Sequence, residues 1–172
     1  LNPYGNDFAM MFWMKLRSCQ DCDISRKGST NTHGGGGWYK VEVSPEAAGS
    51  NQLSLNFNTI GGTAATVTTS EAYNDSTWHF VVAQRIGTTA ELWVDGVRKG
   101  SASVSGTINN SANLTVGSKD SQDDDYINGT IDEYRVYINR SFSSSEINES
   151  MMLTLSKYQS NNGGIKMRTA KI

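Results

Sequence analysis

The sequence of 172 residues predicts an all-β protein: an antiparallel β-sandwich of the jelly-roll type with one short helix near the C-terminus. Three observations predict this fold. Apolar and polar residues alternate with a period of two along most of the chain, as in half-buried strands. Turn-forming residues separate these stretches, and a helical period begins only after Arg140. The length supports one domain with a sizeable core, which we place at residues 1–157.

The expected strands follow one another with little between them except turn residues. In the first, residues 7–16, five apolar side chains from Phe8 to Leu16 fall on one face. The others are expected at 38–43, 51–57, 78–86, 90–100, 114–118 and 130–138. Asp95-Gly96 predicts a tight hairpin turn inside segment 90–100, because Gly accepts the positive φ that such a turn requires. With short strands counted, about seven to ten are expected.

The pattern changes after Arg140. Ser143 and Glu146 have the spacing of a capping box, and Ile147, Met151 and Leu155 then recur at helical spacing. One short helix is therefore expected there. Residues 158–172 are interpreted as a linker followed by IKMRTAKI, residues 165–172, which has the composition of one more strand.

Charge and hydropathy exclude several classes of protein. The formal net charge is −2 and Lys and Arg form no long block, so a nucleic-acid partner is not expected. No apolar run approaches the roughly 18 residues of a membrane span, so membrane insertion is not expected either. The chain starts with LNPYGND, without an initiator Met or the regions of a signal peptide, and is interpreted as a processed or excised piece.

Glycosylation sequons favour an extracellular or cell-surface location. Six Asn-x-Ser/Thr sequences occur, where this composition would give about three by chance. Their asparagines are Asn74, Asn109, Asn113, Asn128, Asn139 and Asn148. The alternative is a bias in composition with no glycan attached.

The two cysteines, Cys19 and Cys22, allow two interpretations. A zinc site would need two further ligands, and only His33 and His79 are present, in distant segments. A short-range disulfide in an oxidising compartment is favoured, and it would brace the loop after the first strand.

The order of several motifs resembles the laminin-G-like, concanavalin-A-like jelly-roll family, including its pentraxin-related branch. The motifs are STWHFVVAQ, AELWVDGVRKG, LTVGS, an acidic loop and NGTIDEYRVYINRSFSSSEI. The resemblance covers roughly residues 8 to 150. It implies two curved antiparallel sheets of about six or seven strands each, and binding far more often than catalysis. Family members usually carry one more strand before the first one here, a position that residues 165–172 could fill.

Two adjacent carboxylates, Asp132 and Glu133, raise the question of glycoside hydrolysis. Some enzymes of the wider fold carry a strand motif resembling E-x-D-x-E, which places two carboxyl groups about 5 to 5.5 Å apart on one sheet face. Here Thr130 and Tyr134 occupy the flanking positions, so hydrolysis is disfavoured and no enzyme is predicted. Strict alternation places Asp132 on the apolar face with Tyr134 and Glu133 on the opposite face. Asp132 is then expected to find a structural partner or a metal ion.

The acidic loop of residues 118–126 is the stronger candidate for a metal site. Calcium prefers six to eight oxygen ligands, which a flexible acidic loop can supply. A similar loop ligates calcium in the resembled pentraxin branch, and the corresponding candidates are Asp120, Gln122, Asp123 and Asp125, with Asp132 as an additional one. The alternative is a solvated acidic turn.

Aromatic residues offer a second route to a sugar site, because a flat ring stacks on the apolar face of a pyranose. Trp38 and Tyr39 follow the glycine-rich loop NTHGGGG and, with His33, are the candidates for ligand contact. Trp13, Trp78 and Trp93 lie in strands and are assigned to packing.

Two hypotheses of function follow. The first is a non-catalytic extracellular module that recognises carbohydrate or glycoprotein in a cell-surface adhesion protein, with or without calcium. The alternative is a structural element of a surface assembly, in which residues 165–172 add a strand to a neighbouring copy.

Overall fold

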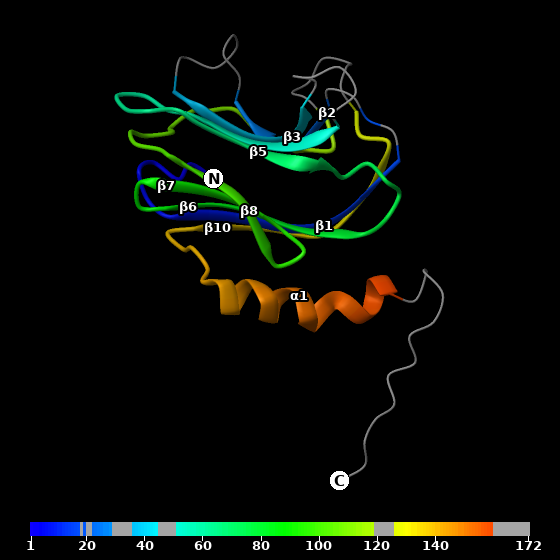
Figure 1. Cartoon of the computed structure of the whole chain (residues 1–172). Coiled ribbons are helices and arrows are strands. Elements are labelled where there is room, and N and C mark those ends of the chain that lie inside the picture. Colours follow the sequence, from blue (N-terminus) through cyan, green and yellow to red (C-terminus); the bar gives the residue numbers. More distant parts are fainter. Residues whose placement is uncertain (18, 20–21, 29–35, 45–50, 119–125, 160–172) are drawn as a thin grey trace.

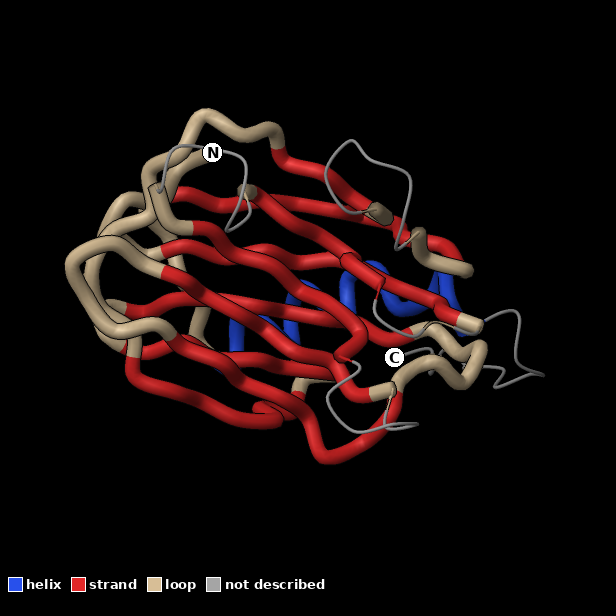
Figure 2. The backbone as a smooth tube through the Cα atoms, turned by 90° about the horizontal axis from the view of Figure 1, so that it is seen from above, coloured by secondary structure: helices blue, strands red, loops and turns tan. Residues whose placement is uncertain are grey.

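Two five-stranded antiparallel sheets pack face to face in the computed structural model, and a helix covers the outer face of one of them (Figure 1). The structure describes residues 1–17, 19, 22–28, 36–44, 51–118 and 126–159. In the orientation of Figure 1, we call the sheet next to the helix the lower sheet and the other the upper sheet. Figure 2, seen from above, has the helix behind the strands.

The lower sheet has the strand order β10-β1-β6-β7-β8 and the upper sheet the order β5-β4-β3-β2-β9. The lower strands are β1 (Phe8–Leu16), β6 (His79–Ile86), β7 (Thr89–Val94), β8 (Val97–Ser103) and β10 (Gly129–Ile138). The upper strands are β2 (Cys22–Lys27), β3 (Trp38–Ser44), β4 (Gln52–Asn58), β5 (Ala65–Ala72) and β9 (Leu114–Val116). The helix is α1 (Ser144–Gln159). The sandwich with one C-terminal helix is the fold that the sequence predicts.

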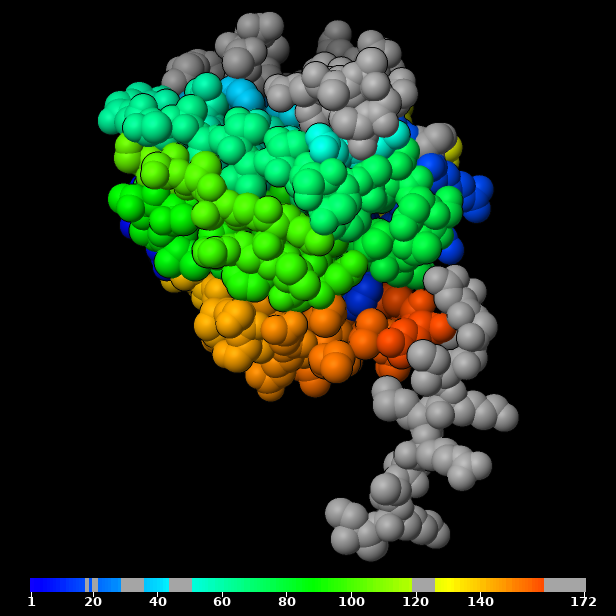
Figure 3. Space-filling model, viewed as in Figure 1, coloured from blue at the N-terminus to red at the C-terminus, as the bar shows by residue number. Residues whose placement is uncertain are grey.

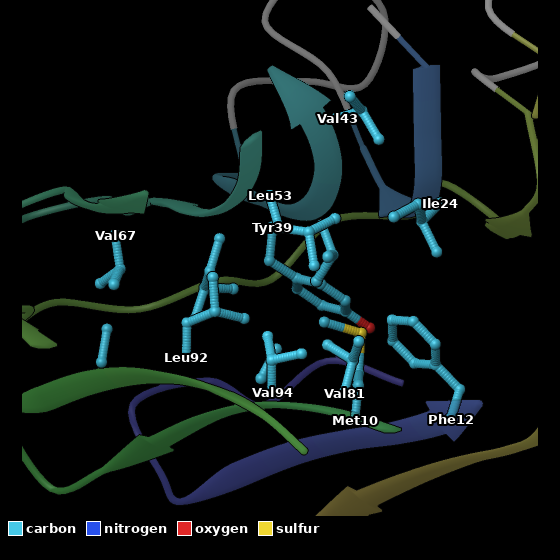
Figure 4. Packing of buried hydrophobic residues seen from close by; sticks show 14 of the residues in the cluster. Met10, Phe12, Ile24, Tyr39, Val43, Leu53, Val67, Val81, Leu92 and Val94 are labelled. Atoms are coloured by element: carbon cyan, nitrogen blue, oxygen red, sulfur yellow. The ribbon is translucent and has the colours of Figure 1, made fainter. Parts of the chain in front are cut away.

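The main core lies between the two sheets and consists of the inward-facing residues of both (Figure 4). Met10 and Phe12 of β1 face Tyr39 of β3 and Leu53 of β4 across it, and all four are fully buried. Phe8 contacts the Tyr39 ring with the ring centroids 4.6 Å apart. The period-two alternation of the sequence therefore places one apolar set of each sheet in a shared interior.

A second apolar cluster lies between the lower sheet and α1, which forms a strip beneath that sheet in the space-filling view (Figure 3). Trp13 of β1 is 2% exposed and donates a hydrogen bond from Nε1 to Thr154 Oγ1 at 2.8 Å. Its ring stacks on Tyr158, with centroids 4.3 Å apart. Three of the four odd-numbered positions of β1, Ala9, Met11 and Trp13, are thus apolar because a helix covers them.

The start of α1 confirms the predicted capping box. The Ser143 backbone N–H donates to Glu146 Oε2 at 2.8 Å, and the Glu146 N–H points back to Ser143 Oγ at 3.4 Å. These two bonds satisfy backbone donors that have no partner inside the helix. Ile147, the first residue of the predicted apolar stripe, is fully buried against the lower sheet.

Two strands were not predicted, and the described sheets have five strands each rather than six or seven. In β2 the charged residues Asp23, Arg26 and Lys27 obscure the alternation of apolar and polar residues. All three are nevertheless buried, because they have partners within the chain. Arg26 Nη1 pairs with Asp23 Oδ2 at 2.7 Å, and Lys27 Nζ donates to Asn110 Oδ1 at 3.1 Å. Burial lowers the pKa of the Lys27 amine. β5 does alternate, but Thr69 is one of its inward residues and Thr66 and Thr68 are outward ones, which weakens the contrast between its two faces.

Candidate ligand-binding site

The two adjacent carboxylates, Asp132 and Glu133, face the same way in the structure, and the predicted opposite orientation is wrong. A β-bulge in β10 shifts the pairing with β1, so that Trp13 lies opposite Asp132 and Met11 opposite Arg135. Glu133 adopts a left-handed conformation with φ of 52°. A bulge adds one residue to a strand and resets its alternation. Both carboxylates therefore lie on the outer side of the lower sheet, facing α1.

Both carboxylates hold the end of α1. The Tyr158 hydroxyl donates to Asp132 Oδ2 at 2.8 Å, and the Glu133 N–H donates to Asp132 Oδ1 at 2.7 Å. The hydrogen bond from Tyr158, followed by the one from the Glu133 backbone, lowers the pKa of the Asp132 carboxyl. The Glu133 carboxylate forms ion pairs with Lys157 of α1 and with Arg135. Within the described ranges, no group of three His, Cys, Asp or Glu residues is arranged to hold a metal ion.

Several predicted site residues lie outside the described residues. They are the four calcium candidates Asp120, Gln122, Asp123 and Asp125, the loop residue His33 and the strand candidate 165–172. Cys19 and Cys22 are described and form a disulfide.

The sequon asparagines lie at the surface. Asn109, Asn113, Asn128, Asn139 and Asn148 are exposed, and Asn74 is half-buried. A glycan on any of these five asparagines would therefore extend into solvent rather than into the core.

Tyr39 and Trp38, two of the predicted ligand contacts, point to opposite sides of the upper sheet. Tyr39 is fully buried between Phe8 and Phe57, and its hydroxyl donates to the Leu1 carbonyl at 3.2 Å. The prediction that Tyr39 contacts a ligand is therefore corrected: it is a core residue. Trp38 precedes it by one position, so the alternation of β3 turns its ring outward, where it is half-buried.

Two cationic side chains, Arg26 and Lys40, lie close to the Trp38 ring on the outer face of the upper sheet. The Arg26 guanidinium carbon lies 5.8 Å from the centre of the indole ring, and Lys40 Nζ lies 5.7 Å from it. Cations at this distance are attracted by the electron-rich face of the ring. The ring is therefore held in place by Arg26 of β2 and Lys40 of its own strand.

A row of polar side chains crosses all five strands of the upper sheet beside Trp38. The register of the strands aligns Thr115 of β9, Arg26 of β2, Lys40 of β3, Asn56 of β4 and Thr66 of β5. Asn56 Nδ2 donates to Glu42 Oε1 at 2.9 Å, and Thr66 Oγ1 donates to Asn56 Oδ1 at 2.9 Å. The Glu42 carboxylate also pairs with Lys40. We call Trp38 and this row the polar face.

The polar face combines the two kinds of group that recognise a sugar. An aromatic ring offers a flat apolar surface, and the neighbouring amide, hydroxyl and charged groups supply both donors and acceptors for hydroxyl groups. Trp38 is the part of this arrangement that sequence analysis selected. Lys40, Asn56 and Thr66 were missed, although outward polar positions in adjacent predicted strands were a usable signal for Lys40 and Asn56. Arg26 was missed as well, but it is buried and holds the Trp38 ring rather than reaching a ligand.

Solved structures share this fold at low sequence identity. Laminin α1 domains LG4-5 of mouse align with a TM-score of 0.62 and 17% identity over 81% of this chain and 37% of that chain. Domain 4 of the extracellular arabinanase AbnA from Geobacillus stearothermophilus, in complex with arabinotriose, aligns with a TM-score of 0.63 and 16% identity over 86% of this chain and 68% of that chain.

A botulinum neurotoxin type C structure, whose cell entry depends on two ganglioside molecules, gives a TM-score of 0.62 and 17% identity over 86% of this chain and 36% of that chain. This chain spans well under half of the laminin and toxin chains. A comparison with curated proteins found no match. No helix in the described residues is long and apolar enough to cross a membrane.

A family model described as the concanavalin A-like lectin/glucanases superfamily, of the laminin G type, matches residues 1–148. The match includes all ten strands of the described residues and the start of α1. It confirms the resemblance carried by the strand motifs, and the chain belongs to this superfamily as a laminin-G-like domain.

Proposed function

We propose that this domain is a non-catalytic extracellular binding module that recognises carbohydrate or glycoprotein through the polar face of its upper sheet. The observation that carries the proposal is the outward Trp38 ring beside the aligned polar side chains of Lys40 and Asn56. The arabinotriose complex and the ganglioside-dependent toxin, which share the fold, support a carbohydrate ligand. The exposed sequons support an extracellular location, and cell-surface adhesion is the proposed setting.

Lack of catalysis is part of the proposal and rests on the carboxylates. Asp132 and Glu133 hold α1 through Tyr158 and Lys157, and are not arranged as a pair flanking an open sugar site. A retaining glycosidase needs two carboxyl groups that can both reach the scissile bond.

A glycan array followed by calorimetric titration of the best ligand tests the proposal. Trp38→Ala removes the stacking surface and is expected to weaken binding by about 1.5 kcal/mol, roughly tenfold. Trp93→Ala is the matched control, because Trp93 is also half-buried but lies on the outer side of the lower sheet. Equal loss of affinity in the two variants, or no glycan bound on the array, contradicts the proposal.

Calcium is a separate part of the proposal, carried by the residue types of the acidic loop. Asp120, Gln122, Asp123 and Asp125 are proposed to supply oxygen ligands. Asp132 is left out, because its two carboxylate oxygens already accept hydrogen bonds from Tyr158 and Glu133. A calcium titration by calorimetry, repeated with Asp123→Asn and Asp125→Asn, decides the matter. The absence of both a heat of binding and a rise in melting temperature in the parent protein would refute it.

A second candidate function is contact with another copy or a neighbouring surface domain. It is favoured by β10, a ten-residue strand at the edge of the lower sheet with β1 as its one partner among the described strands. The mass in solution should then rise with protein concentration. A constant monomer mass rules out contact between copies and leaves the carbohydrate proposal untouched.

A further inference from the structure

An open notch of about 400 Å³ lies at the end of the lower sheet where β10 begins, and one of its lining residues, Trp78, contacts Tyr158 in the last turn of α1. The residues that line it are Lys15, Arg17, Trp78, Asn128, Gly129 and Thr130. Lys15 of β1 is paired with Thr130 of β10, and Met14 is paired with His79, so Trp78 comes next to Lys15 on the other side. Trp78, just before β6, Lys15 of β1 and Thr130 of β10 therefore present an indole, an ammonium and a hydroxyl in one row.

The two cations of the notch have no carboxylate partner in the described part of the chain. The nearby carboxylates are already engaged, Asp132 with Tyr158 and Glu133 with Lys157. Arg17 is exposed and Lys15 half-buried, so both can reach a ligand. A guanidinium beside an ammonium favours an anion with several oxygens, such as a carboxylate or a sulfate.

Trp78 supplies the apolar wall of the notch. One part of its ring packs on Tyr158 of α1, with the ring centroids 4.7 Å apart, and the side chain as a whole remains half-buried. Gly129 forms part of the lining where β10 runs close to β1. A side chain there would approach the Lys15 carbonyl oxygen to 2.3 Å, so glycine is required for this close approach.

We infer that this notch is a binding site for an acidic saccharide, with the anionic group held by Lys15 and Arg17 and the apolar face of the sugar ring against Trp78. It is distinct from the polar face, which lies on the outer side of the upper sheet. The site does not depend on the function proposed for Trp38, and the domain can therefore have two sugar-binding sites of different charge preference.

The notch also contains a glycosylation sequon, since Asn128, Gly129 and Thr130 form an Asn-x-Thr sequence. A glycan on Asn128 would lie over the site and compete with a ligand in solution. The experiment therefore uses the full chain with its disulfide formed, produced in a host that adds no N-linked glycans.

Calorimetry with three trisaccharides of equal length tests the inference: a uronate, a sulfated and a neutral one. The charge variant is Lys15→Gln/Arg17→Gln. The matched control, Arg98→Gln/Arg140→Gln, removes the same charge from positions that do not line the notch. Trp78→Phe removes the indole and keeps an aromatic ring against Tyr158.

The parent protein is expected to prefer at least one acidic trisaccharide over the neutral one, with an affinity that falls as salt is added. The charge variant should lose about tenfold or more of this affinity, the control about twofold or less, and Trp78→Phe an intermediate amount. Binding of either acidic ligand alone identifies which anion the site takes. Equal affinity for all three trisaccharides, no binding of the acidic ones, or equal losses in the charge variant and its control would overturn the inference.

Discussion

Strands of both sheets alternate between inward and outward residues, but the outer faces of the two sheets differ in polarity and in what covers them. Below the lower sheet, outward positions such as Met11 and Trp13 are apolar and α1 covers them. Above the upper sheet, outward positions such as Lys40 and Asn56 are polar and are bonded to neighbours on adjacent strands. The polarity of the outward residues therefore indicates what each sheet face contacts. The apolar face contacts a helix and, as we propose, the polar one contacts a ligand.

The largest expected effect separates the two faces by stability. Trp13→Ala removes a buried indole, its hydrogen bond to Thr154 and its stacking on Tyr158, and should lower the free energy of unfolding by about 3–5 kcal/mol. Trp38→Ala should cost about 1 kcal/mol, because its ring is half-exposed and gains mainly from Arg26 and Lys40. Urea denaturation measures both. Equal losses would mean that the upper face is a packing surface like the lower one.

A second effect concerns the bulge that turns both carboxylates toward α1. Glu133 has φ of 52°, a conformation that β-branched residues avoid. Glu133→Val should therefore lower stability by about 2 kcal/mol. Glu133→Gly relieves the strain while losing the ion pairs with Lys157 and Arg135, and should leave stability within about 1 kcal/mol of the parent. Were valine tolerated as well as glycine, the left-handed conformation of the bulge would be refuted.

A pH-dependent effect arises at the rim of the lower sheet. His79 Nδ1 lies 2.7 Å from Asp95 Oδ2, and Nε2 lies 3.2 Å from Asp75 Oδ1 and 2.8 Å from Thr77 Oγ1. Burial acts to lower the pKa of the imidazole, but the hydrogen bonds and charges of the two aspartates outweigh burial and raise the pKa.

Because the folded-state pKa is the higher one, protonation of His79 stabilises the fold. This contribution is complete below the unfolded-state pKa, about 6.5, and is lost as pH rises through the folded-state value. Denaturation midpoints measured across this range should fall with increasing pH in the parent and lose that slope in His79→Gln. A parent protein whose stability rises over the same range would contradict the assignment.

The smallest effect on stability is expected within the polar face. Asn56 links Glu42 to Thr66, and Asn56→Ala should change the free energy of unfolding by less than about 1 kcal/mol, because the side chain is partly exposed. Its effect on glycan affinity should exceed its effect on stability. Thermal melting and calorimetry on the same sample compare the two effects. A variant that loses stability but keeps its glycan affinity would show that Asn56 stabilises the fold and does not contact the ligand.

Most of the fold was predictable because the alternation of apolar residues is strong in strands such as β1 and β4. The prediction failed where polar partners supplied by tertiary structure satisfy buried charges. Arg26 of β2 is an example. It is buried because it pairs with Asp23, and an acidic residue three positions before a basic one does not by itself indicate a buried strand. The bulge at Glu133 was also out of reach, because nothing in the residue types of β10 marks the point where its alternation resets.

The candidate site was predictable in part. Trp38 was selected because it follows a glycine-rich loop, but the same argument also selected Tyr39, which lies in the core. The alternation within β3 separates the two residues, and only the pairing with β4 and β2 shows which side is the outer one. Lys15, Arg17 and Trp78 come from two distant segments, so no local pattern could join them into a notch.

The four tryptophans provide the most direct test of the central claim, because each reports on a different place in the molecule. Trp13 lies between the lower sheet and α1, Trp93 on the outer side of the lower sheet, Trp78 in the notch and Trp38 on the polar face. The measurement is a nuclear magnetic resonance titration that follows the four indole N–H signals, assigned by single substitutions, as a neutral glycan selected on the array is added. We predict that the Trp38 signal shifts and saturates while those of Trp13 and Trp93 stay in place. An unchanged Trp38 signal at saturating glycan would contradict the claim that the upper sheet binds the ligand.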